Sequence, residues 1–230
     1  MKKSFLFIPG AWMGKWIWKD LKESLEDLNY TVYTVSLRGL ESKNAQKNFD
    51  LQDHVDDVKT FIEEKNLNEL IVVGHSYSGF VIGQLADQVP EKISKLIFLE
   101  AFFPLHDQNL FEAAGLNAKE EIQIMENNSG NWPPPTLDEL KQQKHLSGEQ
   151  IRLLNKKLVD HPGKSVSRNA YIKSDKIEVE SVFIGSNFNM SVRQKLLYGN
   201  VGFYELNGGH WPMLTKRKKL TGILDKIASN

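Results

Sequence analysis

A serine between two glycines is the strongest candidate for chemistry in this sequence. Residues 74–79 read GHSYSG, which fits the pattern G-x-S-x-G with Ser76 at its centre. The predicted strand 69–73 (ELIVV) precedes the pattern and a helix-forming segment follows it, the order of strand, turn and helix that an exposed nucleophilic serine requires. Gly74 and Gly79 have no side chains, whereas a side chain at either position would collide with the neighbouring strand and helix. The pattern predicts Ser76 as a nucleophile; the alternative is a glycine-rich connection with an idle serine.

A nucleophilic serine needs a base, and His210 is the best placed of the six histidines. It lies in the segment NGGHWP, residues 207–212, directly after the last predicted strand, at the strand end where open α/β sheets bind ligands. His75 adjoins the serine and is expected to pack or hydrogen-bond structurally. The remaining histidines are expected on the surface and show no metal-ligand spacing: His54, His106, His145 and His161.

Composition excludes several classes of site and partner. The chain of 230 residues contains no cysteine, which excludes disulfides, thiolate nucleophiles and cysteine-based metal sites. Lys and Arg total 29, as do Asp and Glu, so the zero net charge predicts neither nucleic acid nor an acidic membrane as the main partner. The basic run 216–219 is expected to be a solvated helix face. The apolar run 5–8 is too short for a secretory signal, and no stretch approaches the ~20 apolar residues of a membrane span, so we expect a cytoplasmic protein.

Strands and helices alternate along most of the chain. This alternation predicts the α/β class, with a doubly wound, mostly parallel sheet covered by helices on both faces. Apolar, β-branched or aromatic runs predict strands at 5–8, 30–37, 69–73, 95–99, 179–184 and 201–206. Helical spacing predicts helices at 12–28, 51–64, 76–88 and 212–227, with a shorter helix between the last two strands.

One segment interrupts the alternation. Residues 104–176 contain helical patches but no convincing strand, and the run NWPPP at 131–135 predicts loop or extended chain. An insertion of this length between two strands predicts a mainly helical cap over one end of the sheet. The predicted domains are therefore a core of residues 1–103 and 177–230 and a cap of residues 104–176; the alternative is an insertion without function.

Five segments resemble those of a known superfamily. They are FLFIPGAWMGKWIW at 5–18, SLRGLES at 36–42, VVGHSYSG at 72–79, IFLEAFFP at 97–104 and NGGHWPMLTK at 207–216. With them the chain resembles the α/β-hydrolase superfamily, and in particular its small cap-bearing branch, which includes plant methyl-ester esterases, hydroxynitrile lyases and related bacterial esterases. The resemblance covers both ends and the middle of the chain, and residues 104–176 carry little of it.

The resemblance implies an oxyanion hole formed by the backbone N–H groups of Ala11 and Tyr77. The first motif usually has His before its Gly, where this chain has Pro9; a backbone donor does not depend on that side chain, although the loop can shift. The substrate pocket is expected to include the aromatic residues Trp12, Phe102, Phe103, Trp132 and Trp211. Any of these aromatics could equally be ordinary core.

The third catalytic group is the open question. The resemblance places an acid after strand 179–184, at or near Asn189, yet residues 185–200 contain no Asp or Glu. In one alternative Asn189 orients the imidazole, without the charge that stabilises an imidazolium. In a second alternative the acid is Glu100, at the end of the strand beside the nucleophile strand. In a third the site is degenerate and binds ligands without turnover.

The expected function is a serine esterase that hydrolyses small carboxylic esters through an acyl-enzyme, without cofactor or metal. Its partner is a small-molecule ester, and a homodimer is possible. A catalytically weakened or non-catalytic ligand-binding protein is the main alternative. A hydroxynitrile lyase is a minor one, because the plant lyases carry Thr and Lys where this chain has Ala11 and Trp211.

Overall fold

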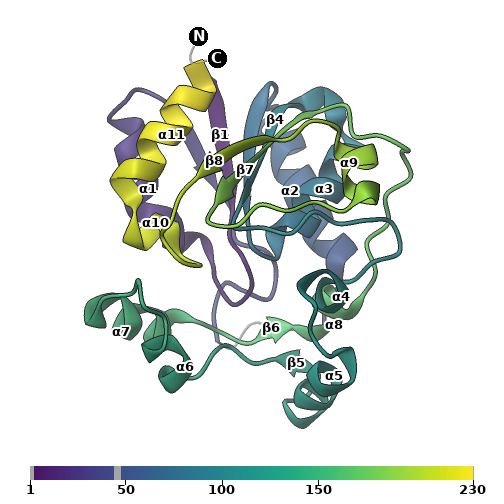
Figure 1. Ribbon diagram of the computed structural model, residues 1–230, viewed down its shortest axis with the longest axis vertical. Coiled ribbons are helices and arrows are strands. Elements are labelled where there is room, and N and C mark those ends of the chain that lie inside the picture. Colours follow the sequence, from purple (N-terminus) through teal and green to yellow (C-terminus); the bar gives the residue numbers. More distant parts are fainter. Residues whose placement is uncertain (1–2, 44–47, 230) are drawn as a thin grey trace.

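A single parallel sheet organises the protein. The computed structural model describes residues 3–43 and 48–229. All five neighbouring strand pairs of the sheet run parallel, in the order β2-β1-β3-β4-β7-β8 (Figure 1). The strands are β1 (Ser4–Ile8), β2 (Thr31–Thr34), β3 (Leu70–His75), β4 (Ile93–Leu99), β7 (Glu180–Gly185) and β8 (Gly202–Glu205). The predicted α/β class and parallel sheet are thus confirmed.

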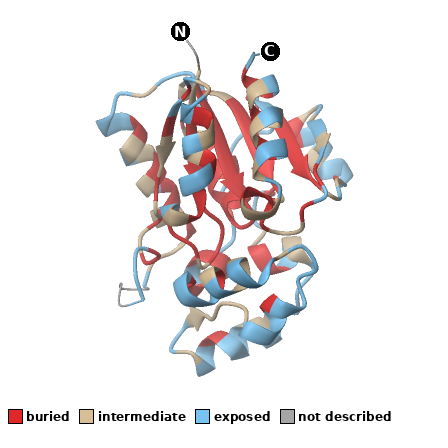
Figure 2. Ribbon diagram, turned by 90° about the vertical axis from the view of Figure 1, so that its left-hand side faces the viewer, coloured by how far each residue is buried: buried red, intermediate tan, exposed pale blue. Residues whose placement is uncertain are grey.

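Helices cover both faces of this sheet, because the side chains of each strand alternate between the faces. In β1, Phe5 and Phe7 belong to the core beneath α1 and α11, whereas Leu6 and Ile8 belong to the core beneath α2 and α3. In Figure 1 these two helix pairs lie on opposite sides of the strands, and Figure 2 shows the strands as the most buried part of the molecule. The helices are α1 (Lys19–Glu26), α2 (Leu51–Glu64), α3 (Ser78–Gln88), α9 (Val192–Tyr198), α10 (Pro212–Thr215) and α11 (Arg217–Ser229), with short 3-10 helices η1 (Lys15–Trp18) and η2 (Pro90–Lys92).

The helices and short strands of residues 104–176, called the insertion below, lie beneath the sheet in Figure 1, whereas Tyr171 and Lys173 near its end donate backbone N–H groups to Gln84 and Asp87 of α3. The insertion holds α4 (Leu110–Ala114), α5 (Ala118–Asn127), α6 (Leu137–Lys141), α7 (Gly148–Lys157) and α8 (Gly163–Ser167). It also holds two short antiparallel strands, β5 (Asn131–Trp132) and β6 (His161–Pro162). The expectation that this segment lacks strands is therefore wrong, because strands of two residues are too short to produce a periodic pattern.

Several predicted boundaries also differ from the structure. The predicted helix 212–227 is two helices, which separate at Lys216. The predicted helix 12–28 begins only at Lys15, since residues 9–14 form the loop that leaves β1. None of the helices within the described ranges is long and apolar enough to cross a bilayer.

Candidate active site

Ser76 occupies a sharp turn between β3 and α3. Its φ of 52° lies in the left-handed region, which is unfavourable for a residue with a side chain. The turn is held by backbone hydrogen bonds on both sides: Ser76 N–H donates to the Leu99 carbonyl at 3.2 Å, and the Gly79 and Phe102 amides donate to the Ser76 carbonyl at 3.0 and 3.4 Å. The surrounding backbone therefore imposes the strained conformation and fixes where the hydroxyl points.

Ser76 and His210 line the same cavity, which has a volume of about 610 Å³. The lining comes from the ends of the core strands and from the insertion, and the insertion supplies its acidic side chains, Glu121 and Glu139. No Lys or Arg of residues 3–43 or 48–229 belongs to the lining. The residues around the cavity are Ala11, Trp12, Ser76, Phe102, Leu110, Ala114, Leu116, Glu121, Ile124, Trp132, Pro133, Pro134, Pro135, Thr136, Glu139 and His210.

His210 follows β8 on a loop that two contacts hold in place. His75 Nε2 donates to the His210 carbonyl at 2.7 Å, and Thr215 Oγ1 donates to the Gly208 carbonyl at 2.6 Å. His210 is half-buried in the cavity wall, and desolvation of its imidazole lowers the pKa to about 4. Within the described ranges, no hydrogen bond joins Ser76 Oγ to this ring. His210 is thus a neutral imidazole over the whole physiological pH range.

Neither candidate acid bonds the His210 ring. One oxygen of the Glu100 carboxylate accepts from the Ser186 N–H at 2.7 Å and from the Ser186 hydroxyl at 3.1 Å, and burial raises the pKa of this carboxyl above its usual range. Asn189 is exposed on the loop after β7. No hydrogen bond from Glu100, from Asn189 or from another group in the described part of the chain orients the imidazole. The first two alternatives for the acid are not realised in this structure.

The two expected oxyanion donors lie beside the serine. Ala11 lines the cavity and Tyr77 directly follows Ser76, and both residues are buried. Among the described residues, no group accepts a hydrogen bond from either of these backbone N–H groups. A buried amide without an acceptor is rare in proteins, and the cavity is where an acceptor can be supplied.

The structure separates the predicted pocket residues into two groups. Trp12, Phe102 and Trp132 line the cavity. Phe103 and Trp211 do not, which corrects the expectation: Phe103 stacks on Phe98 at a ring-centroid distance of 3.9 Å in one core, and Trp211 is buried in the other. Aromatic type alone does not distinguish a cavity wall from a core.

Sequence reasoning missed other members of the site. The prolines 133–135 and the side chains from α4 and α5 complete the cavity wall, and the run of prolines beside Trp132 was the available signal. The expectation that His54 and His161 lie on the surface is wrong, since both are fully buried. Their hydrogen bonds connect the insertion to the serine turn and are described below.

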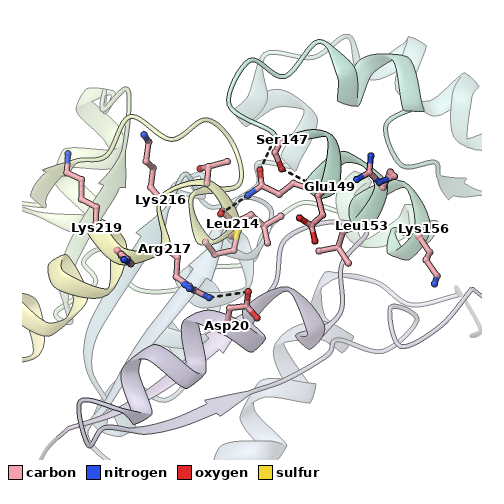
Figure 3. A pocket seen from close by; sticks show the side chains of 14 residues that line it. Asp20, Ser147, Glu149, Leu153, Lys156, Leu214, Lys216, Arg217 and Lys219 are labelled. Carbon is pink, nitrogen blue, oxygen red and sulfur yellow. Dashed lines mark hydrogen bonds and ion pairs between the residues drawn. The ribbon is translucent and has the colours of Figure 1, made fainter.

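A second cavity of about 960 Å³ lies between α7 of the insertion and the start of α11 (Figure 3). The ion pair of Arg217 with Asp20 at 3.2 Å and the hydrogen bond from Gln150 to the Leu214 carbonyl at 2.8 Å cross its walls. It includes neither Ser76 nor His210, and the long chains of Lys216 and Lys219 extend away from it in Figure 3. This cavity lies at the interface between the insertion and the core.

Comparison with known proteins identifies the family of this chain. The profile described as the alpha/beta hydrolase fold matches residues 3–125, and the chain belongs to this family. Over 109 residues it is 36% identical to a carbendazim hydrolyzing esterase of Nocardioides sp. (strain SG-4G), covering 46% of this chain and 45% of that protein. It is 33% identical over 109 residues to an alpha-hydroxynitrile lyase of Arabidopsis thaliana, covering 45% of this chain and 41% of the lyase. The chain thus matches less than half the length of these relatives.

The fold extends beyond the aligned segments. The structure of an extracellular alpha/beta-hydrolase from a Paenibacillus species superposes with a TM-score of 0.82 at 23% sequence identity, covering 97% of this chain and 98% of that one. Relatives named as esterases support ester hydrolysis in a general sense, while the lyase shows that the family also carries out other chemistry.

Proposed function

We propose that this protein is a serine hydrolase that acts on small, uncharged carboxylic esters through an acyl-enzyme. The observation that carries the proposal is the placement of a strained serine, a neutral imidazole and two unused backbone amides around one cavity. A nucleophile, a base and an oxyanion site are the three parts that acyl transfer requires.

The residues divide the reaction between them. Ser76 Oγ attacks the ester carbonyl while a nitrogen of His210 takes its proton and then passes it to the departing alcohol. The Ala11 and Tyr77 amides donate to the oxyanion, and one such donor is typically worth about 2.7–4 kcal/mol. A water molecule, deprotonated by His210, then attacks the acyl group and releases the acid. Hydrogen bonds that are absent without substrate commonly form only in the reactive complex.

The charge and polarity of the cavity support an uncharged ester. Trp12, Phe102 and Trp132 provide aromatic walls, and the lining also contains the acidic side chains Glu121 and Glu139. An ester with a free carboxylate would meet these acidic side chains and, among the described residues of the lining, no Lys or Arg. We propose that the insertion acts as a cap, because it supplies most of the wall opposite Ser76.

Labelling by a fluorophosphonate tests the proposal directly. The reagent phosphonylates an activated serine, so the native protein should be labelled rapidly and the modified peptide should contain Ser76. Heat-denatured protein and the Ser76→Ala variant should remain unlabelled in the same assay. Absence of labelling in the folded native protein would instead favour the binding-protein alternative, which the lack of an acid at His210 supports.

The acid limb of the pH–rate profile is expected near pH 4 to 5. His210 must be neutral to accept the serine proton, and burial lowers its pKa to about 4, so kcat/KM should stay constant from pH 8 to about 5 and fall below that. A carboxylate partner would stabilise the imidazolium and move the limb towards neutral pH. The measurement is hydrolysis of an uncharged p-nitrophenyl ester, with activity at pH 7 restored after each acid incubation as a check on stability.

The Glu100→Gln variant is the matched control for that profile. Because the Glu100 carboxylate bonds Ser186 rather than His210, its neutralisation should leave the limb in place. The opposite result would be an acid limb near pH 6.5 in the native protein and a limb at a different pH in Glu100→Gln. That result would show that Glu100 orients His210.

A further inference from the structure

Buried hydrogen bonds connect the insertion to the loop that carries Ala11. His161, on β6, accepts the backbone N–H of Trp12 at its Nδ1, at 3.2 Å. Its other nitrogen, Nε2, lies 2.8 Å from the hydroxyl of Ser165 on α8. Trp12 follows Ala11 directly, so the contact at Trp12 N fixes the peptide plane adjacent to the one that presents the Ala11 amide.

A ring contact connects His161 to the second oxyanion donor. The His161 ring packs edge-on against the ring of Tyr77, whose backbone N–H is that donor, at a centroid distance of 4.7 Å. The Tyr77 hydroxyl also lies 2.8 Å from His54 Nδ1, and His54 Nε2 lies 3.0 Å from the Arg38 carbonyl. His54, Tyr77, Ser165 and His161 are each at most 1% exposed. One buried network therefore contacts both sides of the proposed oxyanion hole.

Backbone groups at its two ends determine where the protons lie. The Trp12 N–H can only donate, so His161 Nδ1 carries no proton and Nε2–H donates to Ser165, whose own hydroxyl donates to the Pro162 carbonyl at 2.7 Å. The Arg38 carbonyl can only accept, so His54 Nε2 carries the proton and Nδ1 accepts from the Tyr77 hydroxyl. Both imidazoles are then neutral, each in a single tautomer, which gives the network one arrangement.

The insertion also holds the backbone of Trp12 in an intrinsically unfavourable conformation. Its φ of 64° lies in the left-handed region. Its carbonyl accepts from the Val159 N–H at 3.0 Å, and its indole donates to the Trp132 carbonyl at 3.1 Å and packs on the Trp132 ring at a centroid distance of 4.3 Å. Every one of these partners belongs to the insertion, so the core alone does not dictate this loop conformation.

We propose that His161 is a positioning residue that sets the geometry of the oxyanion hole, by accepting the Trp12 N–H and by packing against the ring of Tyr77. The inference deepens the proposed function and rests on it. It assigns the insertion a second role beyond forming the pocket wall: it orients the donors that bind developing charge. Loss of this hold should therefore weaken binding of the transition state and leave binding of the ground state almost unchanged.

The test compares three proteins on an uncharged p-nitrophenyl ester. His161→Leu removes both hydrogen bonds and should lower kcat about 10- to 100-fold with KM within about twofold, less than the 10²–10³-fold cost of deleting a donor. His161→Asn places an amide oxygen near the position of Nδ1, so it can still accept from Trp12 N–H and should recover most of the lost rate. A trifluoromethyl ketone, whose hemiketal oxyanion occupies the hole, should bind His161→Leu more weakly by the same factor as kcat. The matching methyl ketone should bind equally to all three proteins.

Leu154→Ala controls for loosening of the insertion. Leu154 is fully buried on α7 and lies outside the cavity lining, so this variant should lower the melting temperature without changing kcat. Three outcomes would each overturn the inference while the proposed function stands. The first is an unchanged kcat in His161→Leu, and the second is a change in that variant confined to KM. The third is a kcat of His161→Asn no higher than that of His161→Leu when both variants have the same melting temperature. If the native protein shows no turnover that depends on Ser76, the proposed function fails and the inference fails with it.

Discussion

Replacement of Ser76 by alanine is expected to slow hydrolysis of p-nitrophenyl acetate about 10²- to 10³-fold. Loss of the nucleophile in a complete serine, histidine and aspartate site costs about 2 × 10⁶ in kcat. Here no carboxylate within the described ranges bonds the His210 ring, and a base without its charged partner is about 10⁴-fold less effective. The native protein is therefore expected to react more slowly than a protein with a complete site. Dividing the first factor by the second gives the expected loss of rate on replacement of Ser76. Steady-state kinetics against the uncatalysed reaction gives the measurement.

Two further variants make this result decisive. Ser94→Ala, at the opposite end of β4 from the cavity, should retain the native rate. Ser76→Ala combined with His210→Ala should be no slower than Ser76→Ala alone, because a nucleophile and its base act as one unit. A Ser76→Ala protein as active as the native one would refute the hydrolase mechanism, and additive losses would refute the pairing with His210.

The second large effect concerns stability: Gly79→Ala should cost more than about 4 kcal/mol of unfolding free energy or prevent folding. A Cβ at this position would lie 2.0 Å from the Phe102 carbonyl oxygen and 3.0 Å from two other backbone atoms of that residue. Real Cβ contacts are never this short, and a backbone carbonyl between β4 and the insertion cannot rotate away as a side chain can. Overpacking of this severity belongs to the exceptional class of destabilising changes.

Gly222→Ala provides the matched comparison. Gly222 lies inside α11, and a Cβ there would meet no atom within 4 Å. Alanine is the better helix former by roughly 0.5–1 kcal/mol, so this variant should be slightly more stable than the native protein. Urea unfolding of the two variants should give shifts of opposite sign. Equal stability of Gly79→Ala and the native protein would mean that the serine turn and the strand beside it are less closely packed than described.

Local signals in the sequence were sufficient for much of the fold. The helix at 51–64 has the predicted bounds, because its apolar spacing is regular and Asp50 and Asp53 form a capping box at its start. The serine turn was predictable because glycines with strict steric roles flank it. The paired strands β5 and β6 were not, since each has two residues and is held by its partner rather than by its own sequence.

The candidate site was predictable only in part, for a related reason. Spacing locates Ser76 and His210 at strand ends, and the topology of a parallel sheet then brings those ends together. Spacing does not show where a loop side chain turns, so the outward direction of Asn189 and the contact of Glu100 with Ser186 had no sequence signal. The burial of His54 and His161 depends on the insertion closing over them, which is a tertiary effect.

The order of strands in the sheet has a consequence for biosynthesis. The turn of Ser76 follows β3, whereas His210 follows β8, the last strand to be made and the outer one beside β7. During translation Ser76 therefore emerges from the ribosome long before His210. Under the proposed mechanism, the two groups meet only when β8 docks at the edge of the sheet, so a nascent chain that ends before β8 should show no hydrolysis.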